Sequence, residues 1–409
     1  MATLTASPKK AVQPLPWLGF GLCVLAYTFG GTASTLMATY LPVVVSQLLG
    51  NAVPPDQLDK AGAWINAVFL YGWMAGGLLF GPVADRIGRV RALAIVTALC
   101  GVGLLATASV TSLETLLLVR FVTGAGVGGV LLVSTVYISE VWPETSRPIA
   151  LGILSTTFPV GIVATGGLVS GLSDWRVAFN IGLIPVVTAL LIWIFLIESG
   201  VWKSGRSRPF GEKANRSGEL FEPGNRANLL SGTLIFGAVL IGLWGIFGWL
   251  PTWVQTLLPV GESGQTERGV TMMLLGTGGI VGGVLSGFLV RTLGPRRTLM
   301  GTFAACIGAC ALLFLTNRTF SPVVYAELAL LALFFGISQG SLSSYVPTLF
   351  PVSIRATATG FCFNIGRLFT ATAVLFTGVL VTALGGFGNA LLLFSGAFVI
   401  AFMAIWQRK

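Results

Sequence analysis

The sequence predicts an all-α membrane protein with twelve transmembrane helices in two pseudo-symmetric six-helix halves. Three observations predict this fold class. Charged residues make up only 9% of the 409-residue chain, apolar residues form long separate runs, and one hydrophilic stretch divides those runs six and six. A typical soluble domain carries about 25% charged residues. The composition therefore excludes a soluble enzyme, a nucleic-acid-binding domain and a disordered scaffold.

Twelve apolar segments are each long enough to cross a bilayer, which takes about 20 mostly apolar residues per helix. Backbone hydrogen bonds must close within each segment in lipid, so helices are expected. The segments cover roughly residues 17–46, 61–84, 91–110, 114–139, 148–171, 177–199, 229–257, 269–290, 298–316, 323–347, 356–382 and 387–406.

The two halves are expected at residues 1–199 and 229–409, joined by a cytoplasmic linker over residues 200–228. They repeat one another at a nearly constant offset, with Gly88 matching Gly294 and Arg147 matching Arg355. A constant offset indicates duplication. Two six-helix halves with a binding site between them form a known transporter architecture.

Glycines recur at four-residue spacing within several segments, which lets helices in lipid pack closely. We expect such packing for Gly72 and Gly76, for Gly124 and Gly128, and for Gly279, Gly283 and Gly287.

Basic residues fix the orientation, since Lys and Arg concentrate in loops that stay cytoplasmic. Most of the 24 Lys and Arg fall in segments on the same side as both termini. The net charge of +10 then reflects topology, and no nucleic-acid partner is expected. On the outer side we expect Lys60, Arg176, Arg268 and Arg318. We expect a multi-pass protein of the cell inner membrane, with both termini cytoplasmic.

The chain contains no histidine, and its five cysteines all lie within apolar runs. No nucleophile–base set or cluster of metal ligands stands out. We therefore expect no enzymatic activity, no cofactor and no metal site.

Two motifs carry a family resemblance. The loop after the second segment reads GPVADRIGRVR at residues 81–91, and a second pattern joins Arg120 and Gly124 to Glu140, Pro143, Glu144 and Arg147. Ile197-Glu198-Ser199 follows the sixth segment, with Trp202 behind it. Together they resemble the major facilitator superfamily, and are similar to its sugar porter, organic ion and aromatic-acid symporter branches.

The resemblance implies a cytoplasmic gate of ion pairs that holds the halves together when the inner side is closed. Its expected members are Asp85, Arg89, Glu140, Arg147 and Arg355. Partly hydrated ion pairs suit a latch that must open at modest cost. The gate should be lopsided, because the Asp85 and Glu140 positions of the second half hold Arg291 and Thr348.

Two arginines fall inside spans, where a charge is costly and indicates function. Arg367 lies roughly 17 Å into the eleventh segment at a rise of about 1.5 Å per residue. No acid lies at similar depth in any segment. Arg367 could bind the carboxylate of a substrate, or it could bond structurally to backbone carbonyls; both readings stay open.

Arg120 lies in the outer part of the fourth segment. The resemblance implies that a matching Arg pairs with an Asp of the first span in proton-coupled sugar porters. The first segment here has no acid, so proton coupling of that kind is in doubt. Arg120 could draw anions into an outer vestibule, or it could bind carbonyls and hydroxyls of the first span.

The remaining candidate substrate-binding residues are polar or aromatic side chains on several segments. They are Thr32, Thr35, Asn66, Tyr71, Trp249, Gln339, Ser343 and Asn364.

These features favour a monomeric carrier of a small organic anion, such as a monocarboxylate or aromatic acid, working by alternating access. The alternative is a facilitative sugar or polyol carrier. Drug efflux, or a non-transporting receptor on a transporter scaffold, is less favoured. Symport with a proton, uniport and exchange all remain open.

Overall fold

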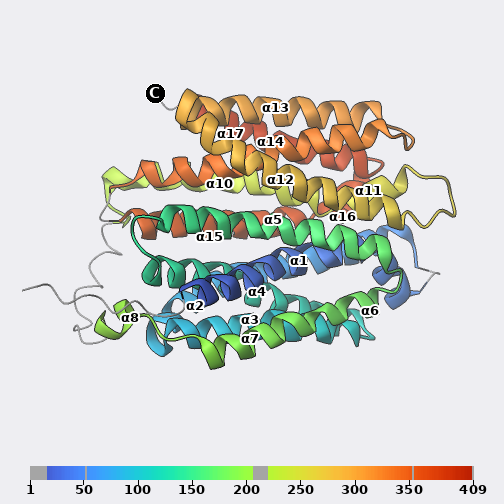
Figure 1. Cartoon of the computed structure of the whole chain (residues 1–409). Coiled ribbons are helices and arrows are strands. Elements are labelled where there is room, and N and C mark those ends of the chain that lie inside the picture. The colour runs from blue at the N-terminus through green and yellow to red at the C-terminus, as the bar shows by residue number, and fades with distance from the viewer. Residues whose placement is uncertain (1–15, 51–52, 206–219, 352–353, 408–409) are drawn as a thin grey trace, which may run out of the picture.

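The computed structural model describes residues 16–50, 53–205, 220–351 and 354–407, and these residues form helices and short connections (Figure 1). Twelve helices or helix pairs in this part of the chain are long and apolar enough to cross a membrane. The predicted fold class is confirmed.

The first half contains five long helices and one interrupted span. The helices are α1 (Pro16–Leu49), α2 (Pro55–Ile87), α3 (Arg89–Ala108), α4 (Leu113–Val141) and α5 (Arg147–Gly171). The interrupted span consists of α6 (Trp175–Phe179), the 3₁₀ turn η1 (Asn180–Gly182) and α7 (Leu183–Phe195), and the short α8 (Gly200–Gly205) follows it.

The second half follows the same plan. Its elements are α10 (Pro223–Phe247), α11 (Leu250–Thr256), α12 (Gln265–Leu293), α13 (Pro295–Thr316), α14 (Val323–Tyr345), the 3₁₀ turn η3 (Val346–Leu349), α15 (Arg355–Leu375), α16 (Thr377–Ala383) and α17 (Phe387–Trp406). Helix α10 begins inside the stretch expected as linker.

The seventh and eleventh spans each break into two helices. In the seventh, α10 ends at Phe247 and α11 resumes at Leu250, next to Pro251. A proline has no amide proton to donate to the preceding turn, so the helix stops ahead of it. The eleventh span breaks between Leu375 and Thr377.

The internal repeat appears in the backbone and in side-chain contacts. Gly88 and Gly294 both adopt a positive φ, +109° and +81°, between consecutive helices. The guanidinium of Arg147 donates to the carbonyl of Trp142, and Arg355 donates in the same way to Phe350. Equivalent residues thus make equivalent contacts in the two halves.

Helices α2 and α4 pack along the glycines that the sequence singled out. A methyl group on Gly72 or Gly76 would collide with the α4 backbone at Phe121 or Ala125. One on Gly124 or Gly128 would collide with the backbone of α2. The expected close packing is confirmed for these four glycines.

In α12 the expected close packing is found at only one of the three glycines, Gly279. Gly279 packs near Pro159 of α5, whereas Gly283 and Gly287 have open space around them. The prediction of close packing is wrong for these two, because Gly283 lines a cavity and Gly287 is exposed.

The halves meet tightly at one end of the bundle, which we call the closed end. Gly378 of α16 lies against the backbone of Asp59 and Lys60, and Gln265 donates to the carbonyl of Val169 over 2.7 Å. In Figure 1 this end, with α6 and α11, lies on the right. Arg268, expected in a loop, lies here in α12 and is only 2% exposed.

The opposite end carries the α2–α3 and α4–α5 connections, α8 and the end of α17, and we call it the basic end (Figure 1). Here Gly152 of α5, Gly287 of α12 and Gly360 of α15 have no other packing atoms within 4 Å of an added methyl group. A cavity between the halves is lined by Gly152 and Gly283 on the side of this end, so the halves are separated towards the basic end and joined at the closed end.

Candidate functional site

A cavity of about 480 Å³ lies between the two halves. Helices α1, α2, α4 and α5 line it from the first half, and α10, α12, α14 and α15 from the second. Its lining extends past Gly152 and Gly283, which lie on the open part of α5 and α12. The cavity thus reaches from the centre of the bundle towards the basic end.

Aromatic rings form much of the cavity wall. The Trp73 ring lies 5.7 Å from that of Phe158 and 5.4 Å from that of Trp244, which belongs to the other half. Phe247 and Phe335 meet edge to face at 4.3 Å. Such a wall suits a flat apolar body, while a few polar groups fix its orientation.

Arg367 is the one charged side chain among the described residues that line this cavity. Its Nη1 is 3.5 Å from the carbonyl oxygen of Phe363, one turn back on its own helix, which is at the limit of a hydrogen bond. Its Cζ lies 5.4 Å from the centre of the Trp73 ring. The residue is half-buried, and its guanidinium has more donors than the one bond to Phe363 uses.

Three of the other expected site residues line the same cavity: Thr35, Gln339 and Ser343. The Gln339 side-chain nitrogen Nε2 is buried and has no hydrogen-bond partner within the described structure. Thr35 is bonded to the Thr165 hydroxyl at 3.1 Å. Gln339 is thus the member of this group with an unused donor.

Several expected site residues lie instead in the seams between helices. The Thr32 hydroxyl donates to the carbonyl of Gly161, and the Tyr71 and Thr372 hydroxyls bond across the two halves at 2.9 Å. Asn364 donates to Gly360 of its own helix. The structure does not bring these three to the cavity wall.

Asn66 and Trp249 lie near the closed end. Trp249 is 1% exposed, and its ring comes within 3.0 Å of a methyl group placed on Gly62, one turn before Asn66. These residues belong to the surfaces where the halves meet rather than to the cavity.

Arg120 is also absent from the cavity wall. It is 1% exposed, its Nη1 donates to the Ala33 carbonyl of α1 over 3.2 Å, and its Cζ lies 4.1 Å from the centre of the Phe69 ring. Of the two alternatives that the sequence left open, contact with a carbonyl of the first span is what this structure contains.

Sequence reasoning missed several residues of the cavity wall. Trp73, Phe158, Ser155, Thr156 and Ser286 line it and were not among the expected site residues. Trp73 lies two turns after Asn66 on α2, so a search for large aromatic residues on the same helix face could have found it.

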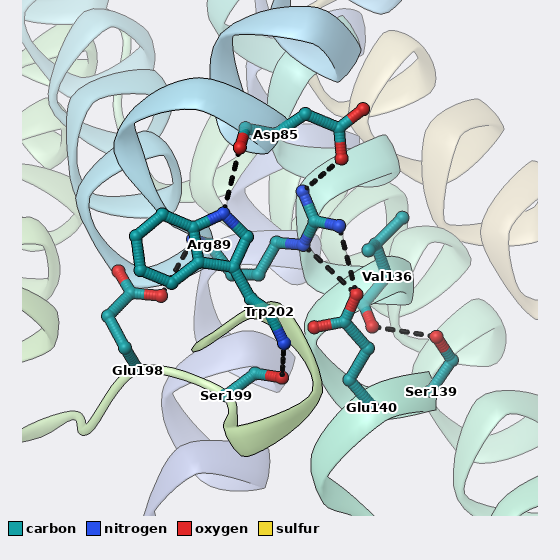
Figure 2. Close-up of polar contacts among 8 residues, drawn as sticks. All are labelled: Asp85, Arg89, Val136, Ser139, Glu140, Glu198, Ser199 and Trp202. Atoms are coloured by element: carbon teal, nitrogen blue, oxygen red, sulfur yellow. Dashed lines mark hydrogen bonds and ion pairs between the residues drawn. The ribbon is translucent and has the colours of Figure 1, made fainter. Parts of the chain in front are cut away.

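An ion-pair cluster lies at the basic end, and Figure 2 shows how its members face one another. Arg89 on α3 pairs with Asp85 on α2 at 2.7 Å and with Glu140 on α4 at 3.0 Å. All three residues belong to the first half. Arg147 instead contacts Glu144 at 3.9 Å, and Arg355 donates to a backbone carbonyl.

The ion pairs of the described residues all lie in the first half, which agrees with the expected lopsidedness. The two ion pairs of Arg89 tie α2, α3 and α4 together, and none of these four ion pairs bridges the halves. This matches the separation of the halves at the basic end.

Glu198, which the sequence singled out only as part of a family motif, completes this cluster (Figure 2). Its carboxylate accepts hydrogen bonds from the backbone amides of Arg89 and Val90, each at 2.8 Å, and from that of Arg91 at 3.3 Å. A carboxylate stabilises a helix N-terminus by pairing its free amides and its dipole. The Glu198 carboxylate would also collide with any side chain at Gly88, whose φ already favours glycine.

Trp202 connects the segment after the sixth span to the same loop. Its indole nitrogen donates to the carbonyl of Asp85 over 2.8 Å, and its amide is held by the Ser199 hydroxyl (Figure 2). The start of the linker is therefore attached to the α2–α3 turn.

Comparison with known proteins agrees with this architecture. The chain is 31% identical over 350 residues to the cis,cis-muconate transport protein of Acinetobacter baylyi, covering 81% of each chain. It is 27% identical to the 4-hydroxybenzoate transporter PcaK of Pseudomonas aeruginosa, covering 90% of this chain and 86% of that one.

Among solved structures, the inward-open xylose transporter XylE from E. coli superposes with a TM-score of 0.79 at 15% identity, covering 96% of both chains. This likeness shows the shared fold. The family model of the Major Facilitator Superfamily matches residues 23–373. The chain is thus a multi-pass membrane transporter and belongs to the Major Facilitator Superfamily.

Proposed function

We propose that this protein carries a small organic anion, a monocarboxylate or an aromatic acid, across the membrane by alternating access. In this proposal Arg367 binds the carboxylate of the substrate. The observation that carries it is the place of Arg367 as the one charged side chain among the described residues of the cavity wall.

The charge of Arg367 is costly where it lies. A guanidinium in a mostly apolar cavity is expensive unless an opposite charge pairs with it. A carboxylate can bond to the planar guanidinium through two parallel hydrogen bonds. The aromatic residues around Trp73 would then hold the ring or chain of the acid. The Gln339 nitrogen offers a further donor.

The similar carriers support the same substrate class. Besides muconate and 4-hydroxybenzoate, the relatives include a gallate transporter of Pseudomonas putida. Each of these names describes a carboxylic acid.

The basic end is the cytoplasmic end in this proposal, because basic loops stay inside. The structure is then the inward-facing state in an inner membrane. In the outward-facing state the closed end opens at Asn66, Tyr71 and Trp249, which lie where the halves meet. Arg120 stays enclosed within the first half, and Thr32 and Asn364 stay in helix seams. At the basic end, Asp85, Arg89, Glu140, Arg147 and Arg355 form the gate that closes when the halves come together.

The test is uptake of radiolabelled acids and sugars by proteoliposomes. Arg367→Ala should reduce organic-acid uptake roughly 10- to 100-fold, the value of a hydrogen-bonded charge pair. Arg318→Ala is the matched control, because it removes an exposed arginine in the α13–α14 loop. Unchanged acid uptake by folded Arg367→Ala contradicts the proposal. Uptake of xylose or glucose in preference to acids favours the sugar carrier.

A further inference from the structure

Among the described residues, those that line the central cavity include the guanidinium of Arg367 and no carboxylate to balance its charge. The chain has 14 Asp and Glu. The acidic residues that belong to helices lie near the helix ends, as Asp56, Asp85 and Glu140 do. Two others, Glu212 and Glu219, fall outside the described residues. None of the described residues that line the cavity is Asp or Glu.

The protein itself neutralises Arg367 poorly. Within the described residues Arg367 contacts the Phe363 carbonyl, through a long bond, and the Trp73 ring, and neither contributes a negative charge. Tyr27 lines the cavity and interacts electrostatically with Arg367, but a phenol is normally uncharged near neutral pH. In the open cavity, water can solvate the remaining donors.

Alternating access requires a moment when both ends are closed. With substrate bound, the occluded cavity holds a neutral guanidinium–carboxylate pair. Without substrate, it must enclose an unpaired charge, which is strongly unfavourable in a low dielectric. An arginine cannot escape this by releasing its proton. The loaded carrier should therefore switch readily, and the empty carrier should not.

We propose that this protein is an anion exchanger, in which the switch that brings one organic anion inwards is coupled to the return of another outwards. The inference rests on the proposed function, because it requires that the substrate be the anion that neutralises Arg367. It attributes the mode of transport to the charge of Arg367, which no described residue of the cavity wall neutralises.

The test compares exchange with net efflux. Proteoliposomes are loaded with radiolabelled 4-hydroxybenzoate, cis,cis-muconate or niacin in potassium sulfate buffer, with valinomycin holding the membrane potential at zero. Efflux is measured into buffer alone and into buffer with the same unlabelled acid. External acid should accelerate efflux at least about tenfold, because the empty carrier faces a higher barrier.

Equal efflux under the two conditions overturns the exchange proposal and leaves the proposed function intact. Failure of all three acids to be taken up, exchanged or released refutes the proposed function itself. The two failures are therefore distinguishable in one experiment.

A second pair of variants tests the cause. Tyr27→Glu places a carboxylate on the wall of the cavity that Arg367 also lines, and Tyr27→Gln is the uncharged control. With a counter-ion in the protein, the empty carrier should be able to switch back between its two open states. Tyr27→Glu should therefore reduce the difference in rate between net efflux and exchange, whereas Tyr27→Gln should not. Persistence of the full difference in an active Tyr27→Glu variant contradicts the proposed cause. If that variant does not fold, the ratio of efflux with external acid to efflux without it, measured on the wild type, tests the exchange proposal by itself.

Discussion

The surroundings of Arg120 and Arg367 differ, although both are arginines within membrane-spanning helices. Arg120 is enclosed, with a carbonyl of α1 at 3.2 Å and the Phe69 ring at 4.1 Å. Arg367 is partly exposed in the cavity, with a carbonyl at 3.5 Å and the Trp73 ring at 5.4 Å. The difference is one of access, because Arg120 is enclosed by atoms of the first half, with its Nε unpaired among the described residues, whereas Arg367 is open to a ligand in the cavity.

The two sites share one design feature. Phe69 and Trp73 lie one turn apart on α2, and their rings meet edge to face at 5.9 Å. Each arginine thus has an aromatic residue of α2 beside it. One helix therefore supports both a structural contact with the first span and the wall of the cavity.

Replacing each arginine by methionine should give the largest contrast. Arg367→Met should weaken binding of an organic acid by about 2–3 kcal/mol, or roughly 30- to 150-fold in Kd. Arg120→Met should leave Kd within about threefold, because Arg120 does not line the cavity. Isothermal titration of purified protein measures both, and equal losses of affinity would remove the distinction between the sites.

Arg367→Lys should have an intermediate effect. It keeps the positive charge but loses the planar pair of donors, so we expect roughly tenfold weaker binding, about 1.4 kcal/mol. Arg120→Lys serves as the matched control and should not change Kd. Full affinity in Arg367→Lys would show that a point charge suffices and that the carboxylate is not bound through two parallel bonds.

Trp73→Leu tests the aromatic wall. Losing the ring should weaken binding of an aromatic acid by about 1 kcal/mol, roughly fivefold, and weaken binding of an aliphatic acid less. The measurement is the ratio of the two Kd values in wild type and variant. An unchanged ratio would mean that the ring of the substrate does not contact this wall.

Phe69→Leu should have the smallest effect on binding and should act on stability instead. The Phe69 ring lies against a buried guanidinium, and such a contact contributes about 1 kcal/mol. Thermal unfolding in detergent should therefore occur at a lower Tm, with Kd for the acid unchanged. A loss of affinity without a loss of stability would place Phe69 and Arg120 at the substrate site.

The sequence was sufficient for the fold and for the importance of the two arginines. The spans and the two halves follow from the lengths of the apolar runs, and the repeat follows from the constant offset between the halves. Neither depends on tertiary detail. Arg120 and Arg367 stand out because charge is so scarce within the spans. The α2–α4 glycine seam was also predictable, since Gly72 and Gly124 pack within one half.

What the sequence could not specify is how each helix is rotated and which state the halves adopt. Tyr71 and Trp249 are polar or aromatic residues on the right helices, yet they face seams between the halves. Gly283 has the spacing of a packed glycine but lies in the open part of the cavity. Glu198 acts through the backbone of a helix that is distant in sequence, and no local pattern reveals that contact.

The most direct test of the central claim is a comparison of one ligand with and without its charge. Binding of 4-hydroxybenzoate and of 4-hydroxybenzamide should be measured on wild type and on Arg367→Gln. Wild type should bind the acid at least about tenfold more tightly than the amide, as a charge-assisted pair requires. Arg367→Gln should bind the two ligands almost equally. A preference for the acid that survives in Arg367→Gln would contradict the claim that Arg367 binds the substrate carboxylate.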